Sequence, residues 1–393
     1  MNAPRLPVLR SDSAARQWFA GLPSSRTGQF FGNHQSLSVI VGMSIATAIL
    51  PFIVLLPPFS GFGNQTDFVD GFAQAGVWVL LAIGLNVVVG LAGLLDLGYA
   101  AFFAIGAYTY AYGASPFSGN HIPFWPMLLV GAAVAAMFGL LLGAPTLRLR
   151  GDYLAIVTLG FGEIVPVVFN NSDQYTNGTN GITALYQPII PFTSTSFGFG
   201  NPVPYYLTVA AIIAIAMALL YRLQDSRLGR AWMAVREDEL AAASMGINTV
   251  TTKLLAFAIG ASTSGLAGVY LSSKLAIVSP TQFGFTVSFT VLAMVVLGGM
   301  GNIWGVAAGA FVIYEIQSQG LKQLDGFVGS WFPNGLPVVG HVEFLNYQYL
   351  LYGLALVGMM LLRPEGLFPS RRRRAELHDV DDSAAANEEL VEP

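Results

Sequence analysis

The chain has 393 residues, of which 54% are hydrophobic and only 10% charged, and its mean hydropathy is +0.60. A soluble domain is typically about 25% charged, so this composition excludes an ordinary soluble protein and indicates one that crosses a membrane several times. The absence of cysteine excludes disulfide bonds, thiolate metal sites and palmitoyl anchors. The net charge of -4 says little, because an acidic C-terminal tail dominates it.

Residues 1–36 are polar and carry four arginines, which makes this segment too long for the basic region of a signal peptide. The apolar run 37–56 has full spanning length and no cleavage site after it, so we expect an uncleaved first span. Further apolar runs predict an all-α polytopic membrane helix bundle of about ten spans between residues 37 and 363. These runs cover residues 71–91, 94–113, 124–147, 153–170, 205–221, 254–278, 285–300, 303–320 and 347–362.

The basic residues cluster in four places: the N-terminal segment, Arg148 with Arg150, the loop 222–253, and Arg363 with the run 371–374. Loops rich in lysine and arginine face the cytosol. An even number of predicted spans separates each cluster from the next, so all four lie on one side. We therefore predict that both termini are cytosolic. The tail 364–393 is basic and then acidic, with the composition of a disordered segment.

The loop 222–253 is the one long polar segment in the interior of the chain, with nine charges in 32 residues. A short helix is predicted within it. Asp238 is a good N-cap and Glu239 suits the positive end of a helix dipole. Ala241 and Ala242 favour helix, and Gly246 is placed to end it. Such a helix either docks in a groove of another protein or belongs to an ordinary loop that only sets topology.

Polar groups inside apolar runs are candidates for a translocation pathway. Glu163 is the strongest, about ten residues or roughly 16 Å of helix rise from the inner edge. It either lines a solute path or, while protonated, joins two helices by hydrogen bonding. Asp96 lies at a turn and either has a similar role or reaches the cytosolic interface. Asn86 and Thr158 are further candidates, or else they join neighbouring helices.

Glycine spacing adds three more candidates. Gly90 and Gly93 follow Val87 at the same spacing at which Gly298 and Gly301 follow Val295. Such a repeat fits a parallel duplication with a binding path between the two halves. On this basis Gly90, Gly93 and Gly301 join the predicted pathway.

Several catalytic motifs are missing from the sequence. No lysine follows a glycine as in a phosphate-binding loop, and no histidine is followed by glutamate as in a zinc protease. We therefore expect neither an enzyme nor a bound cofactor or metal, and no nucleic-acid partner. If transport is active, its energy comes from partner proteins or from an ion gradient.

Five motifs stand out along the chain: G-L-N-V-V-V-G-L-A-G-L-L-D-L-G at 84–98, L-R-L-R-G-D-Y-L-A-I-V-T-L-G-F-G-E at 147–163, G-R-A-W-M-A-V-R-E-D-E-L-A-A-A-S-M-G-I-N at 229–248, L-G-G-M-G at 297–301 and R-P-E-G-L at 363–367. With these motifs the chain resembles, over roughly residues 75–370, the permease subunits of high-affinity branched-chain amino acid ABC importers, specifically the longer, M-type permease.

The resemblance implies a pore shared with a homologous second permease in a bacterial cytoplasmic (inner) membrane. Two cytosolic ATPases and a soluble extracytoplasmic binding protein would complete the importer. The helix in the loop 222–253 would be the coupling helix that docks on an ATPase. Related importers carry E-A-A-x3-G there. In this chain Ala241, Ala242 and Gly246 match, Leu240 takes the acid position, and Glu239 lies one residue early.

Two alternatives stay open. Urea and short-amide ABC permeases are close relatives, and specificity in such importers lies largely in the binding protein. An ion-coupled secondary transporter using Glu163 and Asp96 is the second alternative, and it would work without partner ATPases.

Overall fold

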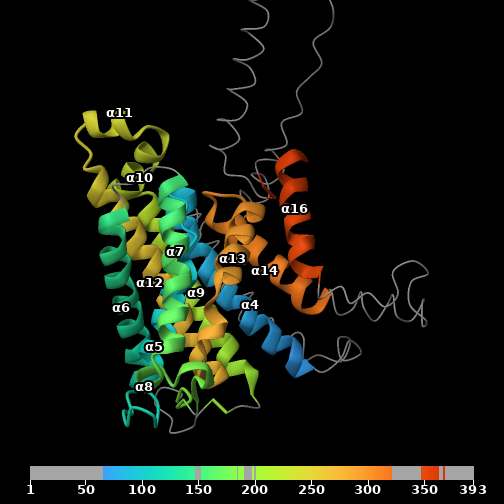
Figure 1. The fold of residues 1–393 in the computed structure, drawn as a ribbon. Coiled ribbons are helices and arrows are strands. Elements are labelled where there is room, and N and C mark those ends of the chain that lie inside the picture. The colour runs from blue at the N-terminus through green and yellow to red at the C-terminus, as the bar shows by residue number, and fades with distance from the viewer. Residues whose placement is uncertain are drawn as a thin grey trace, which may run out of the picture.

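A computed structural model describes residues 65–146, 152–183, 185–189, 197–198, 201–320, 347–362 and 366–367. Over these residues the chain forms a bundle of helices with a single short strand pair, as Figure 1 shows. The all-α prediction is therefore confirmed. The N-terminal segment 1–36, the predicted first span 37–56 and nearly all of the tail 364–393 lie outside the described residues.

The longer helices follow the predicted apolar runs. They are α4 (Gln65–Asn86) with its π-helical extension η2 (Val87–Leu91), α5 (Tyr99–Gly113), α6 (Phe124–Thr146), α7 (Asp152–Asn171), α9 (Pro202–Gln224), α12 (Thr249–Leu275), α13 (Phe285–Gly298), α14 (Ile303–Glu315) with η5 (Ile316–Gly320), and α16 (Gln348–Leu362). The short elements are α8 (Asp173–Thr176), η3 (Gly178–Asn180), β1 (Ile182–Thr183), α10 (Arg227–Glu237), α11 (Glu239–Ser244), β2 (Ile277–Val278) and η4 (Pro280–Phe283).

Six helical segments in the described part of the chain are long and apolar enough to cross a membrane, and two further apolar helices are shorter. The chain is thus a multi-pass membrane protein, while the total of ten spans and the cytosolic placement of both termini stay predictions. One boundary differs from expectation. The helix predicted to begin at residue 94 begins at Tyr99, because Asp96 Oδ1 accepts a hydrogen bond from the Gly98 N–H at 2.9 Å in a non-helical bend.

α12 lies at the centre of the bundle, packed against α4, α5 and α6. Its contact with α5 is made by glycines. A Cβ added at Gly106 would lie 2.4 Å from the carbonyl oxygen of Gly265, so only glycine permits this approach. Lipid tails are as apolar as leucine, and helices in a membrane therefore associate through such close backbone packing. The hydroxyl of Tyr99 adds a hydrogen bond to the Gly260 carbonyl at 3.0 Å.

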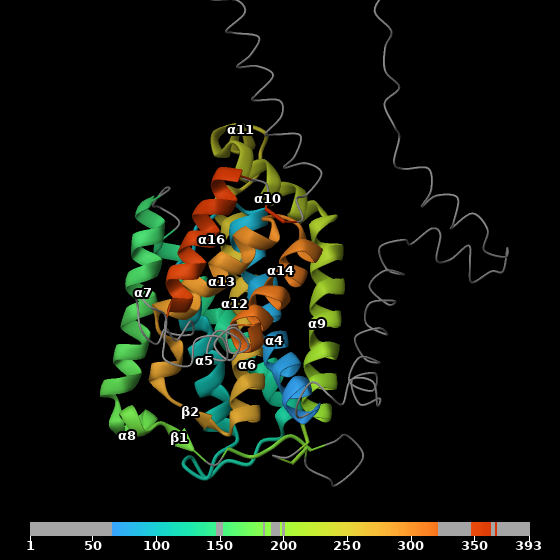
Figure 2. The ribbon, with the colours of Figure 1, turned by 90° about the vertical axis from the view of Figure 1, so that its right-hand side faces the viewer.

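The two ends of the bundle differ, as Figures 1 and 2 show. At one end α8 lies near the β1–β2 pair, which is antiparallel with Ile182 opposite Val278. Near this end Lys274 on α12 forms an ion pair with Asp70 on α4, with Nζ and Oδ1 2.9 Å apart. At the opposite end α10 and α11 project from the bundle. The loop 222–253 is thereby separated from the strand pair by the length of the membrane helices.

Candidate functional site

The projecting loop consists of two helices where the sequence predicted one. Asp238 separates them. Its side chain accepts hydrogen bonds from the backbone N–H groups of Leu240 at 2.8 Å and Ala241 at 3.0 Å, so the predicted N-cap is confirmed. Gly246 has a φ of +85°, the left-handed conformation in which glycine ends a helix, and this prediction is confirmed as well.

α10 was not predicted, and it fastens the loop to the bundle. Ser226 caps it by accepting from the Gly229 N–H at 3.3 Å. Its buried residues are Gly229, Trp232 and Val235, which recur at helical spacing. Trp232 is fully buried, and its Nε1–H donates to the carbonyl of Thr252 on α12 at 2.7 Å. The N-cap serine and this spacing are the signals in the sequence that mark the helix.

α11 presents an apolar outer surface. Ala242 is buried, whereas Ala241 and Ala243 are exposed. Leu240 and Met245 are 66% and 84% exposed, which is unusual for large apolar residues outside a lipid-facing span. A short helix with this surface is suited to a groove on another protein.

The carboxylate of Glu239, the first residue of α11, points toward the bundle instead. Glu239 Oε1 lies 2.7 Å from Nζ of Lys253, whose side chain is only 8% exposed. Because this carboxylate already has a partner on α12, the outward surface of α11 is carried by Leu240, the alanines and Met245. Lys253 is a further residue of this site that the sequence did not single out.

Three of the pathway candidates meet at one place, which we call the glycine junction: Asn86, Gly90 and Gly301. Gly93 lies two residues beyond η2, against the side chain of Arg236. Asn86 is fully buried, and its Oδ1 accepts from the Gly301 N–H at 2.8 Å. A Cβ at Gly90 would lie 2.0 Å from Asn86 Oδ1 and 2.6 Å from the Gly301 nitrogen. The junction therefore joins the end of α4 to the turn between α13 and α14, and only glycine leaves room for that contact.

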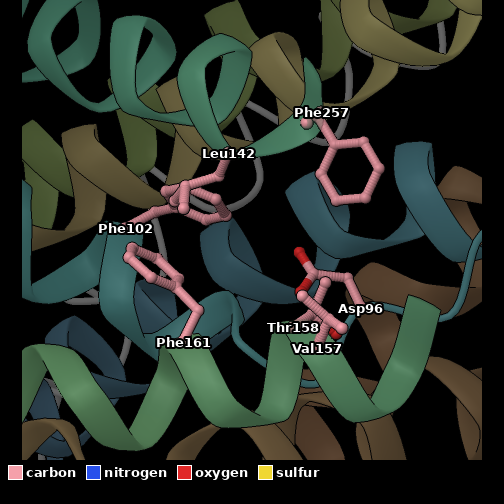
Figure 3. A pocket seen from close by; sticks show the side chains of 8 residues that line it. Asp96, Phe102, Leu142, Val157, Thr158, Phe161 and Phe257 are labelled. Atoms are coloured by element: carbon pink, nitrogen blue, oxygen red, sulfur yellow. The ribbon is translucent and has the colours of Figure 1, made fainter. Parts of the chain in front are cut away.

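Asp96 and Thr158 lie together at a second place, shown in Figure 3. Thr158 Oγ1 accepts from the Leu97 N–H at 3.1 Å, which holds the bend before α5 against α7. Asp96 Oδ2 is buried with no hydrogen-bond partner among the described residues. The Asp96 residue also lines a cavity of about 30 Å³. That volume holds a water molecule, for which roughly 10–15 Å³ suffices, but no amino acid. The other lining residues are mainly apolar: Phe102, Leu142, Gly143, Val157, Phe161 and Phe257.

Glu163 lies apart from both places, near the middle of α7. Its side chain is exposed, and Oε1 accepts from the Phe285 N–H at 3.2 Å. Phe285 is the first residue of α13, so the carboxylate caps the positive end of that helix. A hydrogen bond between the two helices is therefore present, and Glu163 is still exposed at the surface of the chain. Among the described residues, no group of three or more histidine, aspartate or glutamate side chains could hold a metal ion.

Comparison with known proteins identifies the family of this chain. Residues 68–360 match the family model described as "Branched-chain amino acid transport system / permease component". The chain is 39% identical over 323 residues to the high-affinity branched-chain amino acid transport system permease protein LivM of Escherichia coli K12, covering 77% of this chain and 70% of LivM.

More distant relatives belong to the same class of protein. LivH, another permease protein of the E. coli system of that name, is 25% identical over 256 residues, which are 62% of this chain and 82% of LivH. The ribose import permease protein RbsC of Haemophilus influenzae is 27% identical over 297 residues, 73% of this chain and 84% of RbsC. No solved structure matches. The family model covers well over half of the chain, and together with the match to LivM it shows that the chain belongs to the family of branched-chain amino acid transport system permease components.

Proposed function

We propose that this chain is one permease subunit of an ABC importer that moves branched-chain or other small amino acids into a bacterial cell across its cytoplasmic membrane. A homologous second permease, two cytosolic ATPases and an extracytoplasmic binding protein complete the importer. Family membership supports the class of transporter. The observation that carries the proposal is α11, an exposed apolar helix on a loop that is fastened firmly to the bundle.

In this proposal α11 is the surface on which an ATPase docks. Leu240 and Met245 enter a groove of the ATPase, and the exposed faces of Ala241 and Ala243 allow close contact. Asp238 and Gly246 define the length of the helix. Glu239 orients it through Lys253. When ATP closes the two ATPases, the docked helices move with them and shift the permeases between inward-open and outward-open states.

The opposite end of the bundle is the proposed landing surface for the binding protein. Several large apolar or aromatic side chains are exposed there, near the β1–β2 pair: Phe117, Ile122, Trp125, Tyr175 and Ile189. Trp125 is held by a hydrogen bond from Nε1 to the Ile189 carbonyl at 3.0 Å. Clusters of exposed apolar side chains indicate interaction sites outside the lipid-facing part of a protein.

The exposed carboxylate of Glu163 supports a functional role for the outer face of α7. An exposed carboxylate in the middle of a spanning helix is costly in lipid, so such groups face the interior of a bundle or a water-filled path. We therefore propose that the face of α7 around Glu163 lines the solute path or meets the second permease. The other pathway candidates, Asn86, Gly90, Gly93, Asp96, Thr158 and Gly301, stay predictions.

The test is uptake of labelled leucine by proteoliposomes that contain this chain and its second permease, with and without the ATPases and the loaded binding protein. We expect uptake only when all partners are present, together with inhibition by vanadate and insensitivity to ionophores. Uptake without the ATPases and the binding protein, abolished by ionophores, would instead support the ion-coupled transporter.

The same vesicles decide the substrate class. Urea and short amides are added in excess over labelled leucine, with a small neutral amino acid as the positive competitor. Competition by the amino acid alone supports the proposal. Uptake of labelled urea through the same complex would favour the amide permeases.

A further inference from the structure

We propose that Arg236 is the residue that carries movement of α11 to the glycine junction and so couples the charged loop to the membrane helices. This rests on the proposed docking of α11. Arg236 acts by positioning the junction, and it needs no contact with the solute.

The contact itself is close and specific. Arg236 lies in the last turn of α10, and its Nη1 donates to the carbonyl of Gly90 at 2.6 Å. Its side-chain stem crosses Gly93, which has a φ of +70°. A Cβ at residue 93 would lie 2.6 Å from Arg236 Cγ. Both the backbone conformation and the space at residue 93 therefore require glycine beneath this arginine.

The carbonyl of Gly90 belongs to an irregular part of the chain. η2 is a π-helical turn at the end of α4, and the last carbonyls of a helix lack following N–H groups from the same helix. An arginine near such an end can supply the missing donor. π-helical turns are often found at functional sites, and they are local departures from the regular helix. Arg236 thus holds the least regular segment of α4.

From Gly90 the contacts continue across the bundle. Asn86 lies one turn earlier on α4 and accepts from Gly301 in the α13–α14 turn. The segment after α16 reaches the same turn, where the Leu367 N–H donates to the Leu297 carbonyl at 2.9 Å. The opposite end of α13 is capped by Glu163. A displacement of Arg236 therefore reaches α13, and through it the exposed carboxylate, by direct contacts.

A force on α11 reaches Arg236 because the loop behaves as one body. Trp232 ties α10 to α12 through the Thr252 carbonyl, and Glu239 ties α11 to α12 through Lys253. Only Glu237 separates Arg236 from Asp238, the residue that caps α11. Coupling of this kind is carried by packed side chains and hydrogen bonds that link rigid elements.

The first experiment distinguishes a loss of ATPase docking on α11 from a loss of coupling between α11 and the membrane helices. Arg236→Gln, Arg236→Lys and the control Arg230→Gln are compared in the full importer. Arg230 is an exposed residue of the same helix, and its Nη1 donates to the Asp225 carbonyl within the same loop. We expect Arg236→Gln to bind the ATPases and hydrolyse ATP as the parent does, while uptake falls tenfold or more. Arg236→Lys should retain an intermediate rate, and Arg230→Gln the parental one.

Two results would overturn the proposal: uptake by Arg236→Gln within twofold of the parent, or a loss of uptake that is matched by an equal loss of ATPase binding. If the parent chain fails to bind the ATPases, the proposed function has failed instead, and this outcome is distinguishable because it does not depend on residue 236.

A second experiment replaces the contact by a covalent bond. A Cβ at residue 93 would lie 3.2 Å from Arg236 Cβ, close to the roughly 3.5–4.5 Å found in disulfides. The natural chain has no cysteine, so the double variant Gly93→Cys, Arg236→Cys can be oxidised without competing thiols. We expect low uptake in the reduced state and recovery on oxidation, with no such response in either single variant. A pair that cross-links and yet gives equal uptake in both states contradicts the link.

Discussion

The two helices of the charged loop, α10 and α11, lie next to each other in the sequence but differ in burial and in their contacts with the bundle. α10 buries Trp232 and Val235 and bonds to two membrane helices, α12 through Trp232 and the end of α4 through Arg236. α11 buries only Ala242 and leaves Leu240 and Met245 in the open. The contrast indicates a division of work, in which α10 fixes the loop to the bundle and α11 is left available for a partner.

The largest expected effect comes from removing the contact that fastens α10 to α12. Trp232→Ala removes a fully buried indole and its hydrogen bond, and it should lower the free energy of unfolding by about 3–5 kcal/mol. Trp232→Phe is the control, since it keeps most of the volume and leaves the Thr252 carbonyl without this donor, at about 1–3 kcal/mol. Thermal unfolding in detergent measures both. Equal stability of the two variants would show that packing at this site is unimportant.

Substitutions on the exposed surface of α11 should weaken ATPase binding and leave the stability of the chain unchanged. Replacing both Leu240 and Met245 by aspartate removes two apolar anchors, each contributing about 1.5–3 kcal/mol if buried in the partner. ATPase binding in nanodiscs should weaken at least tenfold, since about 1.4 kcal/mol corresponds to a factor of ten. Phe117→Asp, at an exposed position near the opposite end, should leave that binding unchanged. Unaltered affinity of the double variant would remove α11 from the docking surface.

The two partners of the ion pair between α11 and α12 should contribute unequally to stability. Glu239→Gln leaves the nearly buried ammonium of Lys253 without its carboxylate, whereas Lys253→Met leaves a carboxylate that water reaches. Leaving the buried charge unpaired is the greater cost, so we expect about 1–2 kcal/mol for Glu239→Gln and less for Lys253→Met. Denaturant titration of both single variants and the double variant measures this. A larger loss in Lys253→Met would reverse the assignment of which charge is buried.

The smallest effect concerns the cap between the helices. Asp238→Ala removes the acceptor for the Leu240 and Ala241 N–H groups and should cost about 1 kcal/mol. Asp238→Asn keeps an acceptor oxygen and should cost only a few tenths. The helix content of the loop, followed by hydrogen exchange at Leu240 and Ala241, checks this. Exchange that is equally fast in the parent and in Asp238→Ala would contradict the capping role.

Much of the bundle could be predicted from apolar runs, because a spanning helix needs a continuous stretch of apolar side chains and little else. The start of α5 was wrong for the same reason. Leu94, Leu95 and Leu97 continue the apolar run, and only the hydrogen bond between Asp96 and Gly98 reveals the bend. α10 was missed because its charged residues obscured the spacing of Trp232 and Val235.

The candidate site shows a different limit. Asp238 and Gly246 act locally, so their capping roles could be predicted from neighbouring residues. Asn86 and Gly301 are 215 positions apart, and their contact depends on how the whole bundle packs. Sequence patterns selected both residues but could not bring them together. Arg236 was passed over because an arginine in a basic loop has an ordinary explanation in membrane topology.

The position of α11 relative to the membrane and to the ATPases is the central claim, and one labelling experiment tests it. Ala243→Cys places a single thiol on the exposed surface of α11 in a chain that has no other. A membrane-impermeant maleimide should label it in inverted vesicles and not in intact cells, and bound ATPases should protect it. Labelling in intact cells, or labelling that the ATPases leave unchanged, would contradict the account.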